Sequence, residues 1–480
     1  MRKKHISITV GVLLTASFIS GCSGKLTDPK HPVRLTVWHY YNGSQQESFQ
    51  KLVEEFNDTT GKEKGIYVKC MSKGTVGELE QAVNDSMEGK VGADEVPDMF
   101  SAYADTAYII EQQGKLANIS EYITDKELAE YVDSYIKEGY IAGDGGLRIF
   151  PVAKSTEVLM INKTDWETFA EETGVSSDGF STLEGIAELA QEYYDWTDAK
   201  TPEVKGDGKA LYGRDSMANY FVIGMRQQGT EIFQVENGKV TVHDDKEKIR
   251  RLWDNYYVPF IKGYFASYGS FRSDDVKTGD LLAYTGSTAS AMYFPDQIET
   301  NGGSTPIEYS VMPAPILEGG ESFAIQQGAG IVVTKSEKAK EYASVEFLKW
   351  MTQAENNIRF GCEAGYLPVK KNANTRENLD KVTQESQMEV SDKIYACLLS
   401  VLDHAEETEL YACQSFAGAS DARKVLEYSL SDKAAEDRKQ VIQSMEAGST
   451  LEEACEPFLS EETFDAWYES FDSALKAAIQ

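Results

Sequence analysis

The chain has 480 residues, with 47 Lys and Arg residues against 78 Asp and Glu residues and a formal net charge of −31. This length is too great for one small hydrophobic core and predicts two domains or more. Hydrophobic residues make up 41% of the sequence, which excludes an intrinsically disordered chain. The acidic balance excludes a basic nucleic-acid-binding face, and after the first residues no apolar run is long enough for a polytopic membrane protein.

The N-terminus has the pattern of an export signal with a lipid attachment site. Basic residues at positions 2–4 precede a mostly apolar stretch at positions 6–19, as in a signal peptide. The following Ile19-Ser20-Gly21-Cys22 resembles a bacterial lipobox, whose cysteine is lipidated and becomes the mature N-terminus. We therefore predict a palmitoylated lipoprotein on the outer side of the cell membrane, with an ordinary signal peptide as the alternative. The expected segments are a signal peptide over residues 1–21 and a tether over residues 22–32.

Five further cysteines follow Cys22. An odd number in an exported protein leaves at least one thiol unpaired, and no pair has CxxC spacing. We therefore expect no zinc or redox site, no metal and no cofactor. Which thiols pair stays open. The five are Cys70, Cys362, Cys397, Cys413 and Cys455.

The first part of the mature chain alternates short β-prone runs with helical patterns. The strands are predicted at residues 33–38, 66–70 and 97–100, and the helices at residues 44–61 and 76–87. This alternation predicts a parallel α/β sheet with right-handed crossovers. Open sheets of this kind bind ligands at the carboxyl ends of their strands, which here are residues 39–42 and 101–105.

The rest of the chain continues the α/β pattern and ends in helices. Extended runs are predicted at residues 148–153, 157–162, 281–287 and 328–333, and helices at residues 183–194, 246–253 and 338–351. A capping box at residues 450–453 and one apolar face with Phe464, Trp467 and Phe471 indicate helices at the C-terminus. We expect these aromatic side chains in a core.

Several of these segments, in this order, resemble family 1 extracellular solute-binding proteins, the maltose-binding-protein-like lipoproteins that deliver sugars to ABC importers. Each segment is a weak signal alone, and their order and spacing carry the resemblance. The matching segments are the lipobox at Cys22, LTVWHYY (35–41), PDMF (97–100), FPVAKST (150–156), INK (161–163), GAGIVV (328–333), ASVEFLKW (343–350) and GYLPV (365–369).

The resemblance implies a two-lobed α/β fold of the type II periplasmic-binding-protein kind, with a ligand cleft at the hinge. By analogy the chain crosses between lobes near residues 152–156, 283–287 and 333–336. Lobe one would then be residues 33–152 and 286–333, and lobe two residues 153–285 and 334–480. The segment after Ala373 is longer and more acidic than a minimal family member needs, so we expect a helical C-terminal extension of lobe two.

A sugar-binding cleft requires aromatic rings for the C–H faces of the sugar and polar groups for its hydroxyls. Candidates of both kinds occur at the predicted strand ends and crossings. They are Trp38, Tyr40, Tyr41 and Tyr103 as platforms, Asn42, Asp105 and Ser287 as polar partners, and Lys154 and Tyr366 as further contacts. The alternative for Trp38 is burial in the core. The alternative for Lys154 is a salt bridge at the hinge.

The predicted function is capture of a carbohydrate by closure of the two lobes and its delivery to the permease subunits of an ABC importer. We expect no enzyme, because the sequence has no GxSxG, HExxH, Walker or strand-linked GxGxxG motif. Two other classes stay open: an exported lipoprotein glycoside hydrolase, and a sensing or adhesion lipoprotein on the same fold. The size and charge of the ligand and the number of membranes in the envelope also stay open.

Overall fold

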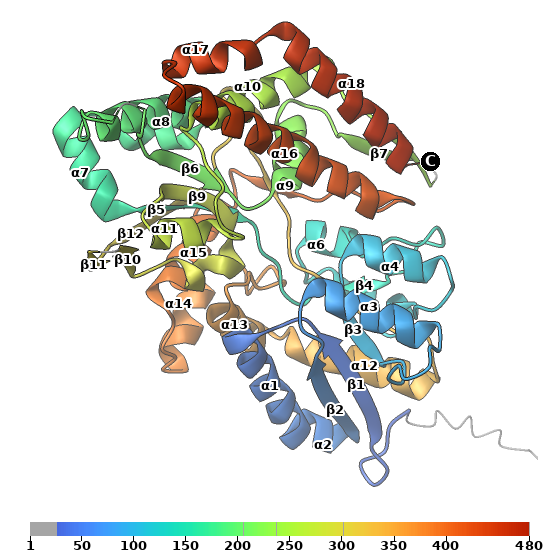
Figure 1. Ribbon diagram of the computed structural model, residues 1–480. Coiled ribbons are helices and arrows are strands. Elements are labelled where there is room, and N and C mark those ends of the chain that lie inside the picture. Colours follow the sequence, from blue (N-terminus) through green and yellow to red (C-terminus); the bar gives the residue numbers. More distant parts are fainter. Residues whose placement is uncertain (1–25, 205, 237, 301, 480) are drawn as a thin grey trace, which may run out of the picture.

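Two β-sheets that share no strand divide the chain into two α/β lobes (Figure 1). The computed structural model describes residues 26–204, 206–236, 238–300 and 302–479. The predicted signal peptide and Cys22 lie outside these residues. Each lobe has its own buried core, so the predicted two-lobed α/β fold is confirmed.

The first lobe is built on a five-stranded sheet in the order β2-β1-β3-β14-β4. Strand β1 (Val33–His39) pairs in parallel with both of its neighbours, β2 and β3, as the strand and helix alternation predicts. The other strands are β2 (Ile66–Ser72), β3 (Met99–Ala102), β14 (Gly330–Val333) and β4 (Ile149–Phe150). The helices are α1 (Gly43–Asp58), α2 (Thr60–Lys64), α3 (Val76–Met87), α4 (Ala104–Glu111), η1 (Ile119–Glu121), α5 (Asp125–Leu128), α6 (Asp133–Lys137), α12 (Lys338–Met351) and α13 (Ala354–Ala364).

The second lobe is built on a four-stranded sheet in the order β12-β5-β9-β6. Its strands are β5 (Glu157–Asn162), β6 (Ala210–Arg214), β9 (Leu281–Ser287) and β12 (Tyr309–Pro313), with hairpins β7 (Phe233–Glu236) to β8 (Lys239–Val242) and β10 (Gln297–Thr300) to β11 (Gly303–Pro306). Its helices are α7 (Lys163–Thr173), η2 (Ser177–Ser181), α8 (Leu183–Asp198), α9 (Met217–Gln227), α10 (Lys246–Lys262), α11 (Arg272–Lys277), η3 (Thr288–Tyr293), α14 (Arg376–Glu385) and α15 (Asp392–Leu402).

The hinge departs from the expected division of the chain. One crossing runs from β4 to β5, through residues 151–156. Residues 286–313 do not enter lobe one, because β12 pairs with β5 in the second sheet. The chain crosses instead between β13 (Phe323–Ile325) and β14.

The expected boundary at residue 333 is also displaced. Helices α12 and α13 bury Phe347, Leu348 and Phe360 in the core of the first lobe, so the chain returns to lobe two only after Ala364. A short strand, β15 (Glu409–Tyr411), then comes back to the hinge and pairs in parallel with β13. These pairings join residues far apart in sequence, which the local apolar pattern does not specify.

The C-terminal helices extend the second lobe, as expected. They are α16 (Ala419–Glu446), α17 (Leu451–Cys455), η4 (Glu456–Phe458) and α18 (Glu461–Ala478). Figure 1 shows α16, α17 and α18 grouped beside α10. The aromatic face of α18 is in the core, where Phe471 stacks on Phe221 of α9 with ring centroids 5.2 Å apart. The predicted capping box at Thr450 and Glu453 is present.

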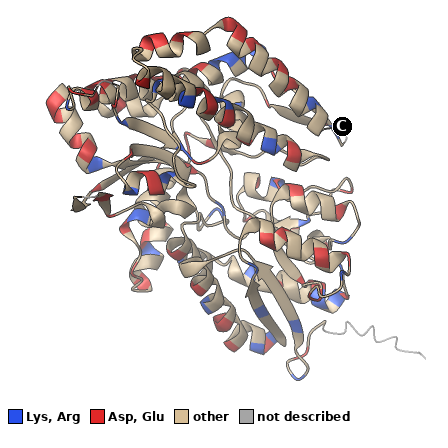
Figure 2. Cartoon of the chain, in the orientation of Figure 1, with Lys and Arg blue, Asp and Glu red and all other residues tan. Residues whose placement is uncertain are grey.

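Figure 2 shows that acidic and basic residues occur along the helices of both lobes. Across the described ranges, every helix is too short or too polar to cross a bilayer.

Candidate functional site

A cleft lies between the two lobes, where β3 of the first lobe ends and where α9 and the start of α16 face it from the second lobe. Its volume is about 370 Å³. The first lobe contributes Glu80, Tyr103, Asp105 and Glu138, the second lobe contributes Asn219, Val222, Phe233, Phe416, Arg423 and Leu426, and the hinge contributes residues 325–328. Both lobes therefore contact any molecule held in the cleft.

Two tyrosines form the aromatic wall of the first lobe. Tyr103 follows β3, directly precedes α4, lines the cleft and is 36% exposed. The ring of Tyr40, which follows β1, stacks behind it with centroids 6.2 Å apart and planes 20° apart. Burial and the neighbouring phenol of Tyr366 hold the pKa of Tyr40 well above its ordinary value. This phenol therefore stays neutral and can donate a hydrogen bond.

The second lobe adds aromatic rings and one cation. Phe233 and Phe416 contact each other with ring centroids 5.0 Å apart, although 183 residues separate them in sequence. Arg423, near the start of α16, donates to the Oδ1 atom of Asn219 at 2.8 Å. The Nδ2 group of Asn219 donates in turn to Glu157, at 2.8 Å. This chain fixes the guanidinium group at the cleft wall.

Glu157 is the buried anchor of that chain. Its second carboxylate oxygen accepts from Arg214 at 2.9 Å, and the side chains of Glu157 and Arg214 are 5% and 4% exposed. A buried carboxylate that accepts from two donors is satisfied without a ligand. Glu157 therefore positions Asn219 and is not itself free to bind a solute.

The hinge forms the floor of the cleft and presents hydrogen-bond acceptors. The backbone of Gln327 pairs with Ser155 in both directions, at 2.8 and 3.0 Å, which joins two crossings. The side-chain amide of Gln326 donates to Glu138. The Oε1 atoms of Gln326 and Gln327 are buried and have no hydrogen-bond partner in the described chain. Buried acceptors of this kind are suited to hydroxyl donors from a solute.

Of the residues predicted from sequence, the structure brings Tyr103 and Asp105 to the cleft, with Tyr40 directly behind Tyr103. Asn42 is exposed and holds the turn after β1, where its amide donates to the carbonyl groups of Tyr40 and Gly74 at 2.9 and 3.1 Å. Ser287 caps η3 by accepting from the backbone of Ala289 at 3.3 Å. Neither of these two side chains is among those that line the cleft.

The other four predicted contacts have side chains that are buried and are not among those that line the cleft. Trp38 is 2% exposed and packs with Phe100 in the first lobe. Tyr41 is 1% exposed and Tyr366 is 5% exposed, and both pack against Phe360. Lys154 is 1% exposed and its ammonium group contacts Glu138 at 2.7 Å and the carbonyl of Gly328 at 2.8 Å. The structural alternatives for Trp38 and Lys154 are therefore correct.

Sequence reasoning missed the second-lobe half of the cleft. Asn219, Phe233, Phe416 and Arg423 come from three separate segments of that lobe, and no local pattern marks them as a set. The one available signal is that α9 begins directly after β6, at a strand end of the second sheet, which points to Asn219.

Comparison with known proteins identifies the family. Residues 51–390 match the sequence model of the family described as bacterial extracellular solute-binding protein. The chain belongs to this family. It is a family of binding proteins that act outside the cytoplasm, so the chain is an exported solute-binding protein.

Solved structures of the same fold cover nearly the whole chain. The cyclic α-maltosyl-1,6-maltose binding protein of Arthrobacter globiformis has a TM-score of 0.64 and 17% identity, over 93% of this chain and 99% of that one. UgpB from Mycobacterium tuberculosis, solved with glycerophosphocholine, has a TM-score of 0.66 and 19% identity, over 93% and 100%. The maltotriose binding protein of Thermus thermophilus has a TM-score of 0.58 and 16% identity, over 93% and 100%. At these identities the likeness establishes the fold, and the resemblance found in the sequence is confirmed.

Proposed function

We propose that the protein captures a neutral carbohydrate in the cleft between its lobes and delivers it to the permease of an ABC importer. The observation that carries the proposal is the cleft itself. Aromatic residues from both lobes line it, together with carboxylates, one guanidinium group and two glutamines whose Oε1 atoms have no partner among the described residues.

This arrangement fits the surface of a sugar. A pyranose has apolar C–H faces, which stack on aromatic rings, and a rim of hydroxyls that donate and accept hydrogen bonds. Tyr103 and Phe416 offer the rings, and the Oε1 atoms of Gln326 and Gln327 accept from hydroxyls. Arg423 supplies donors from the opposite lobe. Structures of this fold solved with maltotriose and with mannotriose support the ligand class.

The charges favour a neutral ligand over an acidic sugar. Lys154 is the cation that kept an acidic sugar among the possible ligands. It is neutralised by Glu138 and is buried. Because Glu138 is paired with Lys154, the residues that line the cleft leave two carboxylates, on Glu80 and Asp105, against the guanidinium group of Arg423. An anionic ligand would meet net repulsion there.

Binding would proceed by closure of the lobes. A solute that contacts Tyr103 on one lobe and Arg423 on the other interacts more strongly with the closed arrangement than with an open one, and so shifts the population toward it. The permease would recognise the closed form. Lipidation at Cys22, which we propose from the lipobox, would hold the protein at the membrane beside that permease.

Thermal unfolding against a panel of neutral mono-, di- and oligosaccharides, polyols and uronates tests this function. A ligand that binds only the native state at a hundredfold excess over its Kd adds about 2.7 kcal/mol to the free energy of unfolding. We expect one class of neutral sugars to raise Tm without being consumed. A Tm raised only by uronates, or turnover of the bound sugar, would contradict the proposal.

A further inference from the structure

A second and larger cavity lies at the hinge and shares no lining residue with the cleft. Its volume is about 600 Å³, within the range of small-molecule sites. Most of its wall is apolar, with side chains from both lobes and from hinge strands β13 and β15. The principal apolar contributors are Val132, Val158, Ile316, Phe323, Leu402 and Leu410.

Three polar atoms in this wall have no hydrogen-bond partner among the described residues. They are the Oγ1 atom of Thr156, the Oδ1 atom of Asn374 and the Oγ atom of Ser400, and the whole Thr156 residue is only 2% exposed. Leaving such atoms unpaired costs free energy, so buried polar groups in native proteins are nearly always satisfied. A bound molecule with hydrogen-bond donors would satisfy them.

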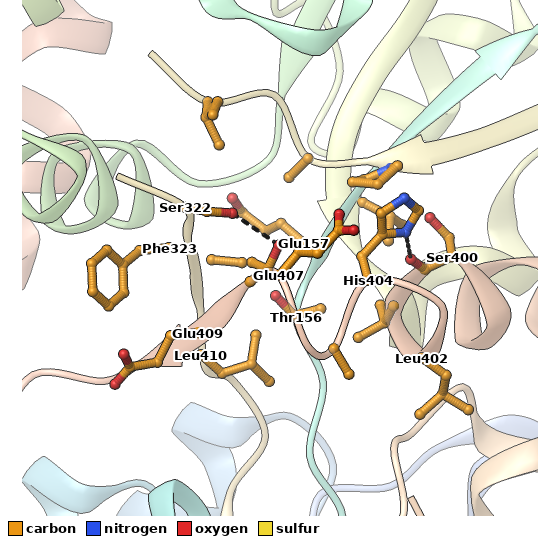
Figure 3. A pocket seen from close by; sticks show the side chains of 18 of the residues that line it. Thr156, Glu157, Ser322, Phe323, Ser400, Leu402, His404, Glu407, Glu409 and Leu410 are labelled. Atoms are coloured by element: carbon orange, nitrogen blue, oxygen red, sulfur yellow. Dashed lines mark hydrogen bonds between the residues drawn. The ribbon is translucent and has the colours of Figure 1, made fainter. Parts of the chain in front are cut away.

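His404, another polar residue in the cavity wall, also favours a ligand that donates hydrogen bonds. Figure 3 shows Thr156, Glu157 and His404 around the cavity. The Nδ1 atom of His404 lies 2.8 Å from the carbonyl oxygen of Ser400, which can only accept, so Nδ1 carries the proton. In the neutral imidazole the Nε2 atom is then an acceptor.

The charges of the wall have one sign. Glu157, Glu407 and Glu409 line the cavity. Arg214 neutralises Glu157, so the negative charge available to a ligand comes from Glu407 and Glu409. Among the described residues, those that line the cavity include neither lysine nor arginine. A positively charged ligand therefore meets complementary charge, and an anion does not.

We propose that this cavity binds a small organic ammonium ion with a hydrocarbon body. The hydrocarbon packs against the apolar wall and the ammonium group donates to Thr156, to Asn374 and to the carboxylate side of the cavity. The site is also connected to the cleft, because Glu157 in its wall holds Asn219, which holds Arg423. Occupancy is therefore expected to change the affinity of the cleft for its own ligand.

Titration calorimetry of the full chain with hexylammonium chloride tests the site, with hexanol and hexanoate as probes of the same length. We expect hexylammonium to bind, hexanol to bind at least tenfold more weakly, and hexanoate to show no binding. Equal affinity for the three probes, or no binding of hexylammonium, would overturn the proposal.

Two variants locate the binding. Ser400→Leu adds volume inside the cavity on α15 and should abolish hexylammonium binding, whereas Ser473→Leu, on the exposed face of α18, should leave it unchanged. If the first variant does not fold, Thr156→Val keeps the shape of the side chain, removes its hydroxyl and should weaken binding about tenfold. Unchanged binding in the folded variants would place the ligand elsewhere and overturn the proposal.

The proposed coupling between the hinge cavity and the cleft is tested by a separate measurement. This test rests on the proposed function. Saturating hexylammonium should change the Kd of the cleft for its sugar by at least threefold. An unchanged Kd would overturn the coupling, and the calorimetry above decides the site without any sugar.

Discussion

Lys154 and Glu138 form an ion pair at the hinge, with the ammonium nitrogen 2.7 Å from the carboxylate and with side chains that are 1% and 12% exposed. Lys154 lies in the crossing between β4 and β5, and Glu138 follows α6 in the first lobe. The same ammonium group donates to the carbonyl of Gly328, in the crossing between β13 and β14, at 2.8 Å. Lys154 therefore joins two crossing segments to the first lobe, next to the floor of the cleft.

Removal of this cation should destabilise the protein strongly. Lys154→Met leaves Glu138 with a charge that is mostly buried and has lost its counterion, which costs about 3 to 5 kcal/mol. Urea unfolding measures the loss. The control is Lys163→Met, which breaks the exposed pair with Glu308 and should cost at most about 1 kcal/mol. Equal small losses in the two variants would contradict the structural role of Lys154.

A methyl group at Gly328 should disturb the hinge. This glycine has a φ of 91°, and an added Cβ would lie 2.7 Å from the carbonyl oxygen of Ala153. Gly328→Ala is therefore expected to lower the free energy of unfolding by about 2 kcal/mol or more. Gly89→Ala is the matched control, since Gly89 has a φ of 65° and open space around it. A similar loss in both variants would show that backbone strain alone, without the contact to Ala153, explains the effect.

Low pH should lower the free energy of unfolding, because His39 is buried in the first lobe as a neutral imidazole. Burial lowers the pKa of this imidazole from 6.5 to about 4. In the unfolded chain the imidazole of His39 takes up a proton near pH 6.5, and in the folded chain only near pH 4. Its contribution to the free energy of unfolding is therefore complete above pH 6.5 and is lost as the pH falls toward 4. The loss amounts to about 3 kcal/mol.

The measurement compares wild type with His39→Leu by urea unfolding between pH 7 and pH 4. Burial raises the pKa of Asp215 to about 6, which acts in the opposite direction in both proteins and cancels in the difference. We expect a shallower acid loss in the variant. Identical pH dependence of the two proteins would refute the assignment to His39.

Reducing agents should leave the stability unchanged. All five cysteines of the described chain carry free thiols, and Cys362, Cys397 and Cys455 are buried. Burial raises the pKa of Cys362 and of Cys397 to about 12, so little thiolate forms at neutral pH. Iodoacetamide should label these two positions, as measured by mass spectrometry, only after unfolding. A Tm lowered by dithiothreitol would reveal a disulfide and contradict this account.

The sequence predicts those features that depend on local order. Strands β1 and β2 and helix α3 follow from apolar periodicity, and Tyr103 and Asp105 follow from the rule that ligands bind at the ends of parallel strands. The partner strand of β14 and the lobe to which β12 belongs depend on pairing across more than a hundred residues. For the same reason the sequence does not predict that Phe416 and Arg423 reach the cleft from the C-terminal extension.

Burial separates the predicted residues that line the cleft from those that do not. Trp38, Tyr41 and Tyr103 are all aromatic residues at or near strand ends, and sequence alone gives them the same status. Only Tyr103 is open to the cleft, because Trp38 is covered by α3 and Tyr41 by α1 and α13. The neutralising partner of Lys154 likewise lies 16 residues away, at a position that no motif marks.

The central claim is that the cleft between the lobes holds a neutral carbohydrate. Titration calorimetry of wild type, Tyr103→Ala and Tyr67→Ala with the sugar panel tests it most directly, since Tyr67 is a tyrosine exposed on β2, away from the cleft. We predict that the sugar bound by wild type binds about tenfold more weakly to Tyr103→Ala, because a stacking face is lost, and equally well to Tyr67→Ala. Equal affinity of wild type and Tyr103→Ala for that sugar would contradict the account.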